Sequence, residues 1–418
     1  MKISSATRAA ATPPAGLVVP LRGDAPPVPA TQAAATPPAG QAGQAHLGAR
    51  ATVVATAAIF GLTCSLSSAL IAIDLAEMGF SETVIGANAS MHAVGVLAAA
   101  FFLPGIASLL GMRRTILAGL ALSALILLLF PLMPYFWLWF PLRILLGASS
   151  EALFALSETW LNALSSEATR ARAMAVYTAV LSLGFALGPV ILSIVGTDGA
   201  APYITGASLA AFAALLIVSS RIHAPAVEKP AHANPVRFMK LSPPAMAVTA
   251  LNAAVETAGL TFLTLYAVNL GWDEPQATRL MSCIMAGAMV LQLPIGWLGD
   301  KMDRRRLIIL LAAAAALGAL IWPAALASPL ATYGLLFVWG GLFVGIYTIM
   351  LAIVGSRFSG GELIGLYASM GFMWGAGALL GPLLAGGAMQ LTLHGLPFFV
   401  AAACGAFCFM IVRLGERM

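Results

Sequence analysis

The chain has 418 residues, of which 60% are hydrophobic and 9% are charged, and its formal net charge is +5. Soluble domains carry about 25% charged residues, so this composition excludes a water-soluble fold and indicates a protein whose main solvent is lipid. The positive charge does not indicate nucleic-acid binding, because the basic residues stand between apolar blocks and form no continuous patch.

Residues 1–50 differ in composition from the rest of the chain. They are rich in Ala, Pro, Gly, Thr and Gln, and such a segment cannot bury enough apolar surface to fold. They also lack the apolar core of a secretory signal peptide. We therefore expect a disordered cytoplasmic tail over residues 1–50 and assign no function to it.

Twelve apolar blocks follow this tail, and each is long enough for a helix that crosses ~30 Å of hydrocarbon, which needs ~20 residues. They are too long, and alternate too little, for a β-barrel. The longest polar interruption, 222–244, contains five prolines and divides the blocks six and six. We expect an all-α membrane protein with two six-helix bundles, at 51–221 and 245–418, joined by a cytoplasmic linker at 222–244. The expected spans are 51–74, 83–104, 114–134, 136–159, 173–196, 202–221, 245–269, 277–298, 307–327, 330–354, 363–389 and 396–414.

Basic residues between the blocks are distributed unevenly. The alternate loops 75–82, 197–201, 270–276, 328–329 and 390–395 contain no Lys or Arg, and several of them contain Asp or Glu. Because Lys and Arg concentrate in cytoplasmic loops, we expect both termini in the cytoplasm. The basic residues then assigned to the inside are Arg50, Arg113, Arg114, Arg170, Arg172, Arg221, Lys229, Arg237, Lys240, Lys301, Arg304, Arg305, Arg306, Arg357, Arg413 and Arg417.

Sequence motifs for enzymatic or metal chemistry are absent. No H-E-x-x-H, phosphate-binding glycine loop or acidic metal cluster occurs, so we do not expect an enzyme. The cysteines lie inside apolar blocks without a C-x-x-C pair, and we expect them to pack as small side chains rather than form disulfides. We expect no metal and no cofactor.

The two halves share internal motifs. "GIASLLGMRR" (105–114) separates spans 2 and 3, and "GWLGDKMDRR" (296–305) separates spans 8 and 9. "GFALGP" (184–189) in span 5 and "GALLGP" (377–382) in span 11 both read G-x-x-x-G-P. Such repeats predict two parallel six-span halves. The glycines allow close helix contact and the prolines allow bending. This helix-packing motif comprises Gly184, Gly188, Pro189, Gly377, Gly381 and Pro382.

At these motifs the sequence resembles the major facilitator superfamily, over about residues 51–414. "RILLGASSEA" (143–152) is similar to the R-x-x-x-G element of span 4, and "GFALGP" resembles the span-5 signature of antiporters without its later glycines. The stretch 157–177 resembles a poorly characterised bacterial branch. The superfamily's loop signature, G-x-x-x-[DE]-[RK]-x-[GD]-[RK]-[RK], is matched by Gly296, Asp300, Lys301, Asp303, Arg304 and Arg305.

The resemblance implies a secondary active transporter of the bacterial inner membrane that works by alternating access. Spans 1, 4, 7 and 10 would line a central cavity for a small-molecule substrate, with the proton gradient as energy source. Few fixed charges face that cavity, so we expect a neutral or amphipathic compound, and the resemblance of span 5 to the antiporter signature favours its proton-coupled efflux by a monomer in the lipid bilayer. A sugar or metabolite uptake permease is an alternative, as is a non-transporting receptor or scaffold.

The resemblance also implies a cytoplasmic gate. The loop acid of the superfamily approaches the start of a helix in the opposite half, so Asp300 would approach Arg170 and Arg172 at the start of span 5 and stabilise the outward-open state. Acidic side chains are stabilised near helix N-termini, because the unpaired N–H groups there carry a partial positive charge. The alternative, that the basic cluster only sets topology, does not explain Asp300 and Asp303.

The first-half copy of the loop lacks the acid. Leu109 and Leu110 stand in place of the acid and base, which leaves Arg113 and Arg114. We hypothesise that Glu362, near the start of span 11, faces one of these arginines. Glu158, near the cytoplasmic end of span 4, is expected to pair with Arg113 or Arg170 as part of the gate.

Ionisable residues inside spans are functional candidates by default. On span 4, Arg143, Glu151 and Glu158 are spaced by eight and seven residues and so share one side of the helix. Glu256 lies near the middle of span 7, with Asn252 one turn earlier.

Glu151 and Glu256 are the best proton-carrier candidates, because a carboxyl group that is protonated when buried and ionised when exposed can couple proton entry to substrate movement. Arg143 has three interpretations: a salt bridge to Glu151, an anionic-substrate site or a proton sensor. His92, in span 2, is either a helix-packing residue or a proton-relay residue.

Overall fold

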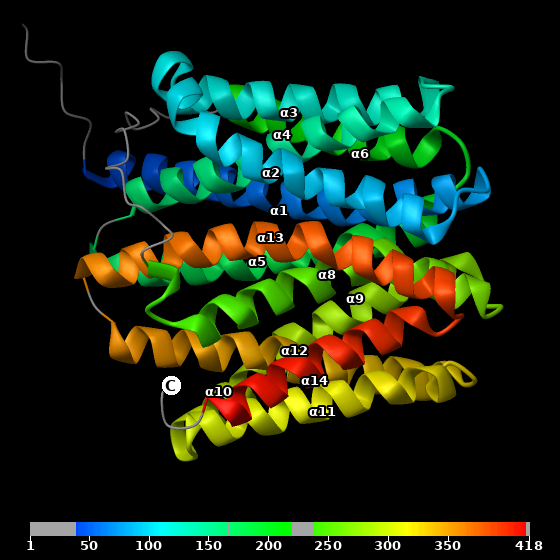
Figure 1. The fold of residues 1–418 in the computed structure, drawn as a ribbon. Helices are drawn as coiled ribbons and strands as arrows, with labels where there is room; N and C mark the ends of the chain where they lie inside the picture. The colour runs from blue at the N-terminus through cyan, green and yellow to red at the C-terminus, as the bar shows by residue number, and fades with distance from the viewer. Residues whose placement is uncertain (1–38, 166, 220–237, 359, 415–418) are drawn as a thin grey trace, which may run out of the picture. The chain divides into compact units, whose positions relative to one another are not determined.

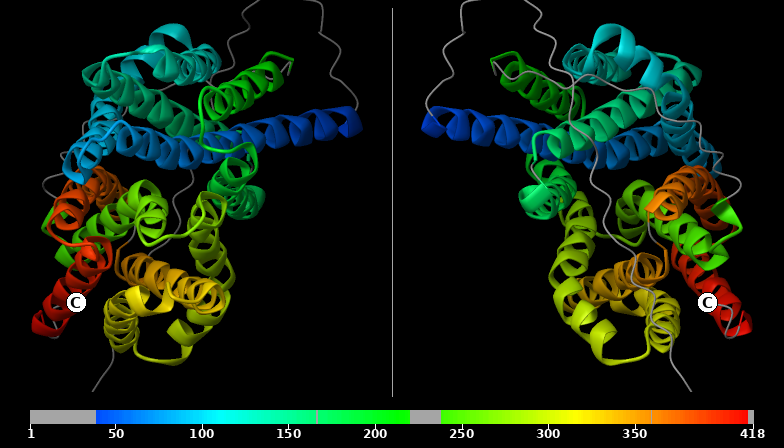
Figure 2. Two further views of the ribbon diagram at one scale, coloured as in Figure 1. Left: turned by 90° about the vertical axis from the view of Figure 1, so that its right-hand side faces the viewer. Right: turned by 90° about the vertical axis from the view of Figure 1, so that its left-hand side faces the viewer.

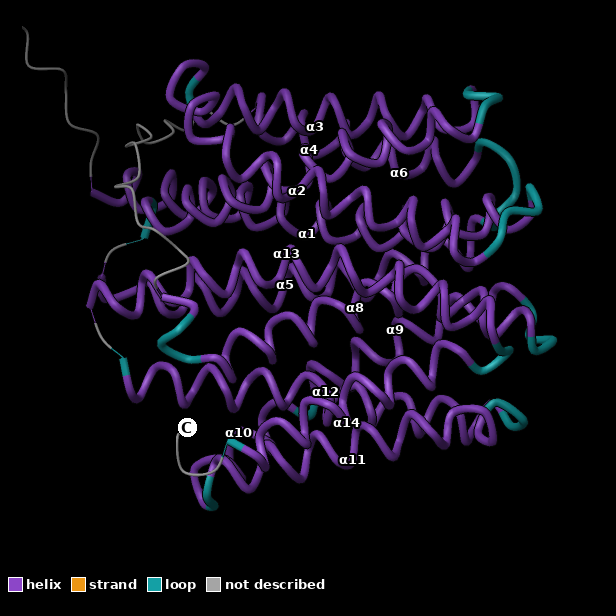
Figure 3. Tube along the Cα trace, viewed as in Figure 1, coloured by secondary structure: helices purple, strands orange, loops and turns teal. Residues whose placement is uncertain are grey.

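The computed structural model describes residues 39–165, 167–219, 238–358 and 360–414. In this part of the chain every regular element is a helix (Figure 3). The chain separates into two compact units, residues 1–43 and 44–418. Of the first unit the structure describes only the start of helix α1, and all the other helices belong to the second unit.

Twelve segments among the described residues are long and apolar enough to cross a membrane. The prediction of an all-α membrane protein with twelve spans in two six-span bundles is thereby confirmed (Figure 1). The first bundle contains α1 (Ala39–Glu77), α2 (Glu82–Leu110), α3 (Met112–Leu129), α4 (Trp139–Ala163), α5 (Glu167–Val195) and α6 (Ala201–Ser219), with short 3₁₀ turns at Phe130–Leu132 and Phe136–Leu138. The second contains α8 (Pro243–Asn269), α9 (Glu274–Val290), α10 (Gln292–Lys301), α11 (Arg304–Ala325), α12 (Pro329–Arg357), α13 (Gly360–Leu391) and α14 (Gly395–Arg413).

Three expected boundaries change. Helix α1 begins at Ala39, so the expectation of a disordered tail is wrong for residues 39–50, where Ala and Gln favour a helix. Most of the expected linker, residues 222–237, lies outside the described residues, and α8 begins at Pro243. The eighth span is not one helix: it breaks at Leu291 into α9 and α10, because Pro294 has no N–H to continue the hydrogen-bond ladder.

The two bundles repeat their turns. Two residues after α1 and α8 end, the chain turns at Gly79 (φ 82°) and Gly271 (φ 89°), a left-handed conformation that favours glycine. The residues that follow, Gly-Phe-Ser-Glu and Gly-Trp-Asp-Glu, begin the next helix in the same way. This match identifies the turns after α1 and α8 as equivalent.

The G-x-x-x-G-P segments place α5 on α1 and α13 on α8. A Cβ added to Gly184 would overlap the carbonyl oxygen of Ala58, and one added to Gly381 would overlap that of Ala254. Gly188 and Gly377 approach the same two partner helices. The backbones therefore approach more closely than any larger residue would allow, as in other membrane-helix contacts.

The bundles contact each other mainly through two helix pairs, α2 with α13 and α5 with α9. Figure 2 shows, in two further views, the first and second bundles adjoining at these pairs. We call the end that carries the connections 78–81, 196–200 and 270–273 the acidic-loop end. The opposite end, with the connections at Gly111 and 302–303, is the basic-loop end.

Contacts between α2 and α13 lie toward the acidic-loop end. The Ser90 hydroxyl donates to the Leu379 carbonyl oxygen at 2.6 Å, and Thr83 is hydrogen-bonded to Gln390. Gly86 of α2 lies directly against the backbone of Pro382. Toward the basic-loop end the same two helices diverge (Figure 1).

The α5–α9 pair also meets toward the acidic-loop end. Thr197 is hydrogen-bonded to the Glu274 carboxylate, Arg279 Nε donates to Ser193 Oγ at 3.1 Å, and Ser282 Oγ donates to the Ala186 carbonyl oxygen at 2.6 Å. Residues 260–267 of α8 are all buried, whereas several positions from 247 to 259 are partly exposed. The bundles are therefore joined at the acidic-loop end.

Close packing of α13 on α8 predicts a specific cost for one added methyl group. Gly381→Ala would place a Cβ on the Ala254 carbonyl oxygen, and overpacking of this kind costs about 1–3 kcal/mol. We expect a lower thermal unfolding midpoint in detergent. Gly387→Ala on the same helix is the control, because no atom lies within 4 Å of its Cβ position. Equal midpoints for the two variants would contradict the close approach.

Candidate functional site

Arg143 of α4 is the centre of a group of buried polar residues. Its side chain is 3% exposed, and its Nη2 donates to Ser68 Oγ of α1 at 3.3 Å. Among the described residues its Nε and Nη1 have no hydrogen-bond partner. A buried charge with unsatisfied donors is unusual and requires an explanation.

Helix α2 contributes two polar residues beside α4. Nδ1 of His92 and both amide atoms of Asn88 are buried without a partner in the described part of the chain. These residues are four apart, so they lie on one face of the helix. Gly147, one turn after Arg143, lies against the His92 backbone, which brings the two helices into direct contact.

Helix α8 contributes Asn252 and Glu256 from the second bundle. The Asn252 amide nitrogen donates to Glu256 Oε2 at 3.2 Å, and its Oδ1 has no partner among the described residues. The neighbouring Ala253 packs with Ala93 of α2, so Asn252 and His92 lie at one level.

The expected salt bridge between Arg143 and Glu151 is wrong. No ion pair joins these two described residues, because eight residues of helix separate them by about 12 Å along its axis. Glu151 and Glu158 are partly exposed, unlike Arg143. The exposed fraction along this side of α4 therefore rises toward the basic-loop end.

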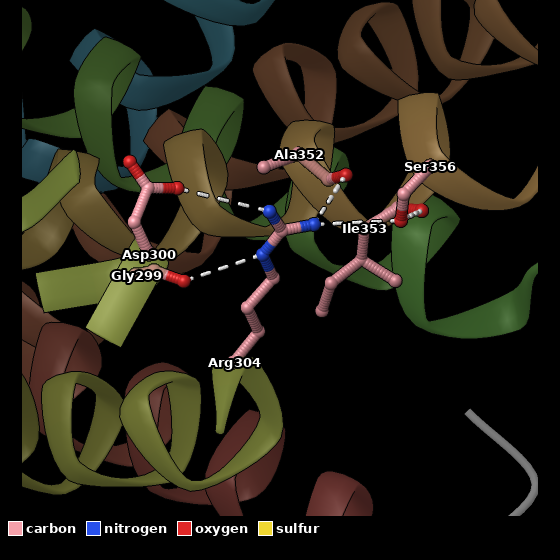
Figure 4. A network of polar contacts seen from close by, with 6 residues as sticks. All are labelled: Gly299, Asp300, Arg304, Ala352, Ile353 and Ser356. Atoms are coloured by element: carbon pink, nitrogen blue, oxygen red, sulfur yellow. Dashed lines mark hydrogen bonds and ion pairs between the residues drawn. The ribbon is translucent and has the colours of Figure 1, made fainter. Parts of the chain in front are cut away.

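Arg304 organises the loop before α11 through contacts within the second bundle. Figure 4 shows its guanidinium between α10 and α12: Nε donates to the Gly299 carbonyl oxygen at 3.3 Å and Nη1 to that of Ala352 at 3.1 Å. Ser356 Oγ lies 3.4 Å from Nη1, and Asp300 Oδ1 lies 3.9 Å from Nη2. Arg304 therefore joins the ends of two helices within one bundle.

The other charged residues of this loop have local contacts. Asp303 is the N-cap of α11 and accepts a hydrogen bond from the Arg306 backbone N–H at 2.8 Å, which explains the second acid of the motif. Lys301 lies 3.9 Å from the centre of the Trp297 ring. Asp300 is 80% exposed, and the side chains of its expected partners, Arg170 and Arg172, lie outside the described residues.

Arg113 and Arg305 occupy equivalent positions in the two bundles. Arg113 Nη2 donates to the carbonyl oxygens of Ile217 and Val218 at the end of α6, both at 2.9 Å. Arg305 Nη2 donates to the last carbonyl groups of α14 in the same way, at 3.3 Å. A cation at a helix C-terminus is stabilising. Each arginine is the second residue of its helix. Arg113 therefore corresponds in the structure to Arg305, whereas the two loop motifs of the sequence match it with Arg304.

Among the described residues, Glu158 forms no ion pair with Arg113, and Glu362 forms none with Arg113 or Arg114. Arg113 contacts α6 instead of Glu158. The other candidate partner of Glu158 is Arg170, whose side chain lies outside the described residues. Arg114 and Glu362 are exposed, and no ion pair joins Glu362 to either arginine. Because the bundles meet at the acidic-loop end, the Glu362 hypothesis for the opposite conformation stays a prediction.

Two functional candidates were missed by the sequence reasoning. Arg279, in α9, is a basic residue inside an apolar block, a signal visible in the sequence, and it contacts Ser193 of the other bundle. Asn88 gives no signal until its burial is known. No group of three or more His, Cys, Asp or Glu residues suited to a metal ion occurs in the described ranges.

Comparisons with known proteins agree with this architecture. A family model described as Major Facilitator Superfamily matches residues 53–372 and, separately, 245–417. An uncharacterized MFS-type transporter of Bacillus subtilis (strain 168), YfkF, is 25% identical over 81% of this chain and 88% of its own length. The crystal structure of the nucleoside transporter NupG matches with a TM-score of 0.73 and 14% identity, over 89% of this chain and 99% of that chain. A bacterial homolog of the human lysosomal transporter Spinster matches with a TM-score of 0.71 and 12% identity, over 88% and 97%.

Removal of the Arg304 side chain should destabilise the second bundle. Arg304→Met would leave the Gly299 and Ala352 carbonyl oxygens without their charged donor, at a cost of about 1–3 kcal/mol. We expect a lower thermal unfolding midpoint of the purified protein. Arg306→Met is the matched control, because that exposed side chain has no described contact. A control that loses as much stability as Arg304→Met would contradict this role.

Proposed function

The chain belongs to the major facilitator superfamily of secondary transporters, and we propose that it exports a small neutral or amphipathic solute in exchange for protons. We place it in the bacterial inner membrane as a monomer, with both termini and the basic-loop end in the cytoplasm. The uneven distribution of Lys and Arg supports this orientation.

The observation that carries the proposal is a pair of intramembrane carboxyl groups, one in each bundle. Glu256 of α8 and Glu151 of α4 have no ion pair among the described residues. Acidic residues within a membrane span are costly and usually serve transport. A carboxyl group without a fixed basic partner is free to gain and lose a proton as its exposure changes.

Alternating access gives these groups a role. In the proposed orientation the structure is joined on the outer side, and Glu151 and Glu256 are partly exposed. Rocking of the bundles would break the contacts at the acidic-loop end and expose the same carboxyl groups outside. Asp300 would then approach α5 and stabilise that second conformation, a role supported by its position in an exposed loop. Export as the direction rests on the resemblance of α5 to the antiporter signature.

The test begins by finding a substrate through comparison of metabolites in deletion and overproducing cells. The purified protein is then placed in proteoliposomes, and transport of that substrate is driven by an imposed pH gradient. We expect Glu256→Gln and Glu151→Gln to reduce gradient-driven transport to the level of empty liposomes, because neither amide can carry a proton. Exchange of labelled for unlabelled substrate should persist in at least one variant.

Asp273→Asn is the control for these variants, because Asp273 is an exposed acid at the opposite end of α8 and α9. Wild-type rates in both glutamine variants would disprove the assignment of the proton carriers. Accumulation of substrate together with protons would retain the carriers but reverse the direction, and the protein would then be an importer.

A further inference from the structure

We infer that Arg143 binds the carboxylate of a singly charged organic anion, so that the transported solute is an amphipathic monocarboxylate. The inference rests on the proposed function, because it names the substrate class of the same site. It selects the anion-binding interpretation of Arg143 over the salt bridge and the proton sensor.

Burial without a counter-charge is the first observation. Arg143 is the one Lys or Arg side chain that is buried among the described residues, and no described carboxylate lies within 4.0 Å of it. Asp74, two turns beyond Ser68 on α1, is instead hydrogen-bonded to the Tyr203 hydroxyl at 2.6 Å. A buried charge is strongly unfavourable unless it is paired. The site therefore lacks one negative charge, which a substrate can provide.

Hydrogen-bond geometry indicates the kind of anion. Ser68 occupies only Nη2, which leaves Nε and Nη1 as free donors on a planar guanidinium. Such a group binds two carboxylate oxygens at once. Asn88 and His92 add unsatisfied neutral groups on the adjacent helix, which can bind other polar atoms of the solute. His92 belongs to the same site because its backbone lies against Gly147, one turn after Arg143.

Charge balance favours a monoanion over a dianion. One guanidinium neutralises one negative charge, and no second buried Lys or Arg is found in the described part of the chain. A second negative charge on the solute would have no buried basic partner among the described residues. A phosphate monoester is therefore a poorer ligand than a carboxylate.

The surroundings of the site favour an apolar body on the solute. Between Arg143 and Glu158, α4 reads "ILLGASSEALFALS", which is mostly apolar. The same side of α4 becomes more exposed toward the basic-loop end, so a solute could enter from there and reach Arg143 with its carboxylate first. The equivalent helix of the second bundle, α12, has Leu336 four residues before Gly340, where α4 has Arg143 before Gly147. The charge thus belongs to one bundle only and is not required by the shared fold.

The test uses the full chain in lipid nanodiscs and matched probes. Benzoate and octanoate are compared with benzamide and octanamide, which have the same shape without the charge, and with phenyl phosphate. Ligand binding raises the thermal unfolding midpoint. We expect saturable stabilisation by the carboxylates, little by the amides at the same concentration, and less by phenyl phosphate than by benzoate.

Variants assign the effect to Arg143. Arg143→Met should weaken carboxylate binding by roughly 30-fold or more, because it removes one partner of a buried charge pair. Arg143→Lys should retain part of it, and Lys240→Met, which removes an exposed charge before α8, should bind as wild type. If Arg143→Met does not fold, the comparison of carboxylates with amides on the wild type and on Arg143→Lys still decides.

Several results would overturn the inference. They are stabilisation by no carboxylate, equal stabilisation by carboxylates and amides, tighter binding of phenyl phosphate than of benzoate, or undiminished binding to Arg143→Met. Glu256→Gln separates this inference from the proposed function. Carboxylate binding that persists in this variant while proton-driven transport is unaffected would refute the proton carrier and leave the anion site intact.

Discussion

The structure depends on how its two bundles are joined. At the acidic-loop end they meet through backbone-to-backbone contact of glycines such as Gly86 and through a few hydrogen bonds, including Ser90 to Leu379 and Ser282 to Ala186. Each such hydrogen bond contributes about 0.5–1.5 kcal/mol net. A small set of them is strong enough to hold one conformation and weak enough for ligand binding to reverse it.

The shared fold and the chemistry of the site are distributed differently over the halves. Turns, close-packed glycines and the arginines that bind helix ends recur in both bundles, as in Arg113 and Arg305. The polar residues of the interior do not recur. Cys64 and Glu256 occupy equivalent positions, each fifteen residues before the glycine of the turn that follows its helix, Gly79 or Gly271. Only Glu256 is acidic. Symmetric residues therefore build the fold, and the asymmetric polar residues are the ones to which we assign binding and coupling.

Spans, their number and their grouping were predictable from the sequence, because apolar length alone decides whether a helix can cross a bilayer. Side-chain partners were not. Asp303 was expected to act in a gate and is an N-cap, and Arg143 was expected near Glu151 and contacts Ser68. Residue spacing gives the side of a helix that a charge occupies, but not the neighbouring helix that it meets. The unsatisfied polar atoms of Asn88 and Arg143 could be recognised only once the burial of these side chains was known.

Distances between spin labels at the two ends of α2 and α13 test the central claim most directly. In a variant without native cysteines, one label pair at Leu109 and Glu362 reports the basic-loop end. Another pair, at Met78 in the turn just before α2 and at Leu391, reports the acidic-loop end; all four positions are exposed. If the bundles rock about a central site, acidification or bound solute shortens one distance while it lengthens the other. Two distances that stay fixed, or that change in the same direction, would contradict alternating access by this chain.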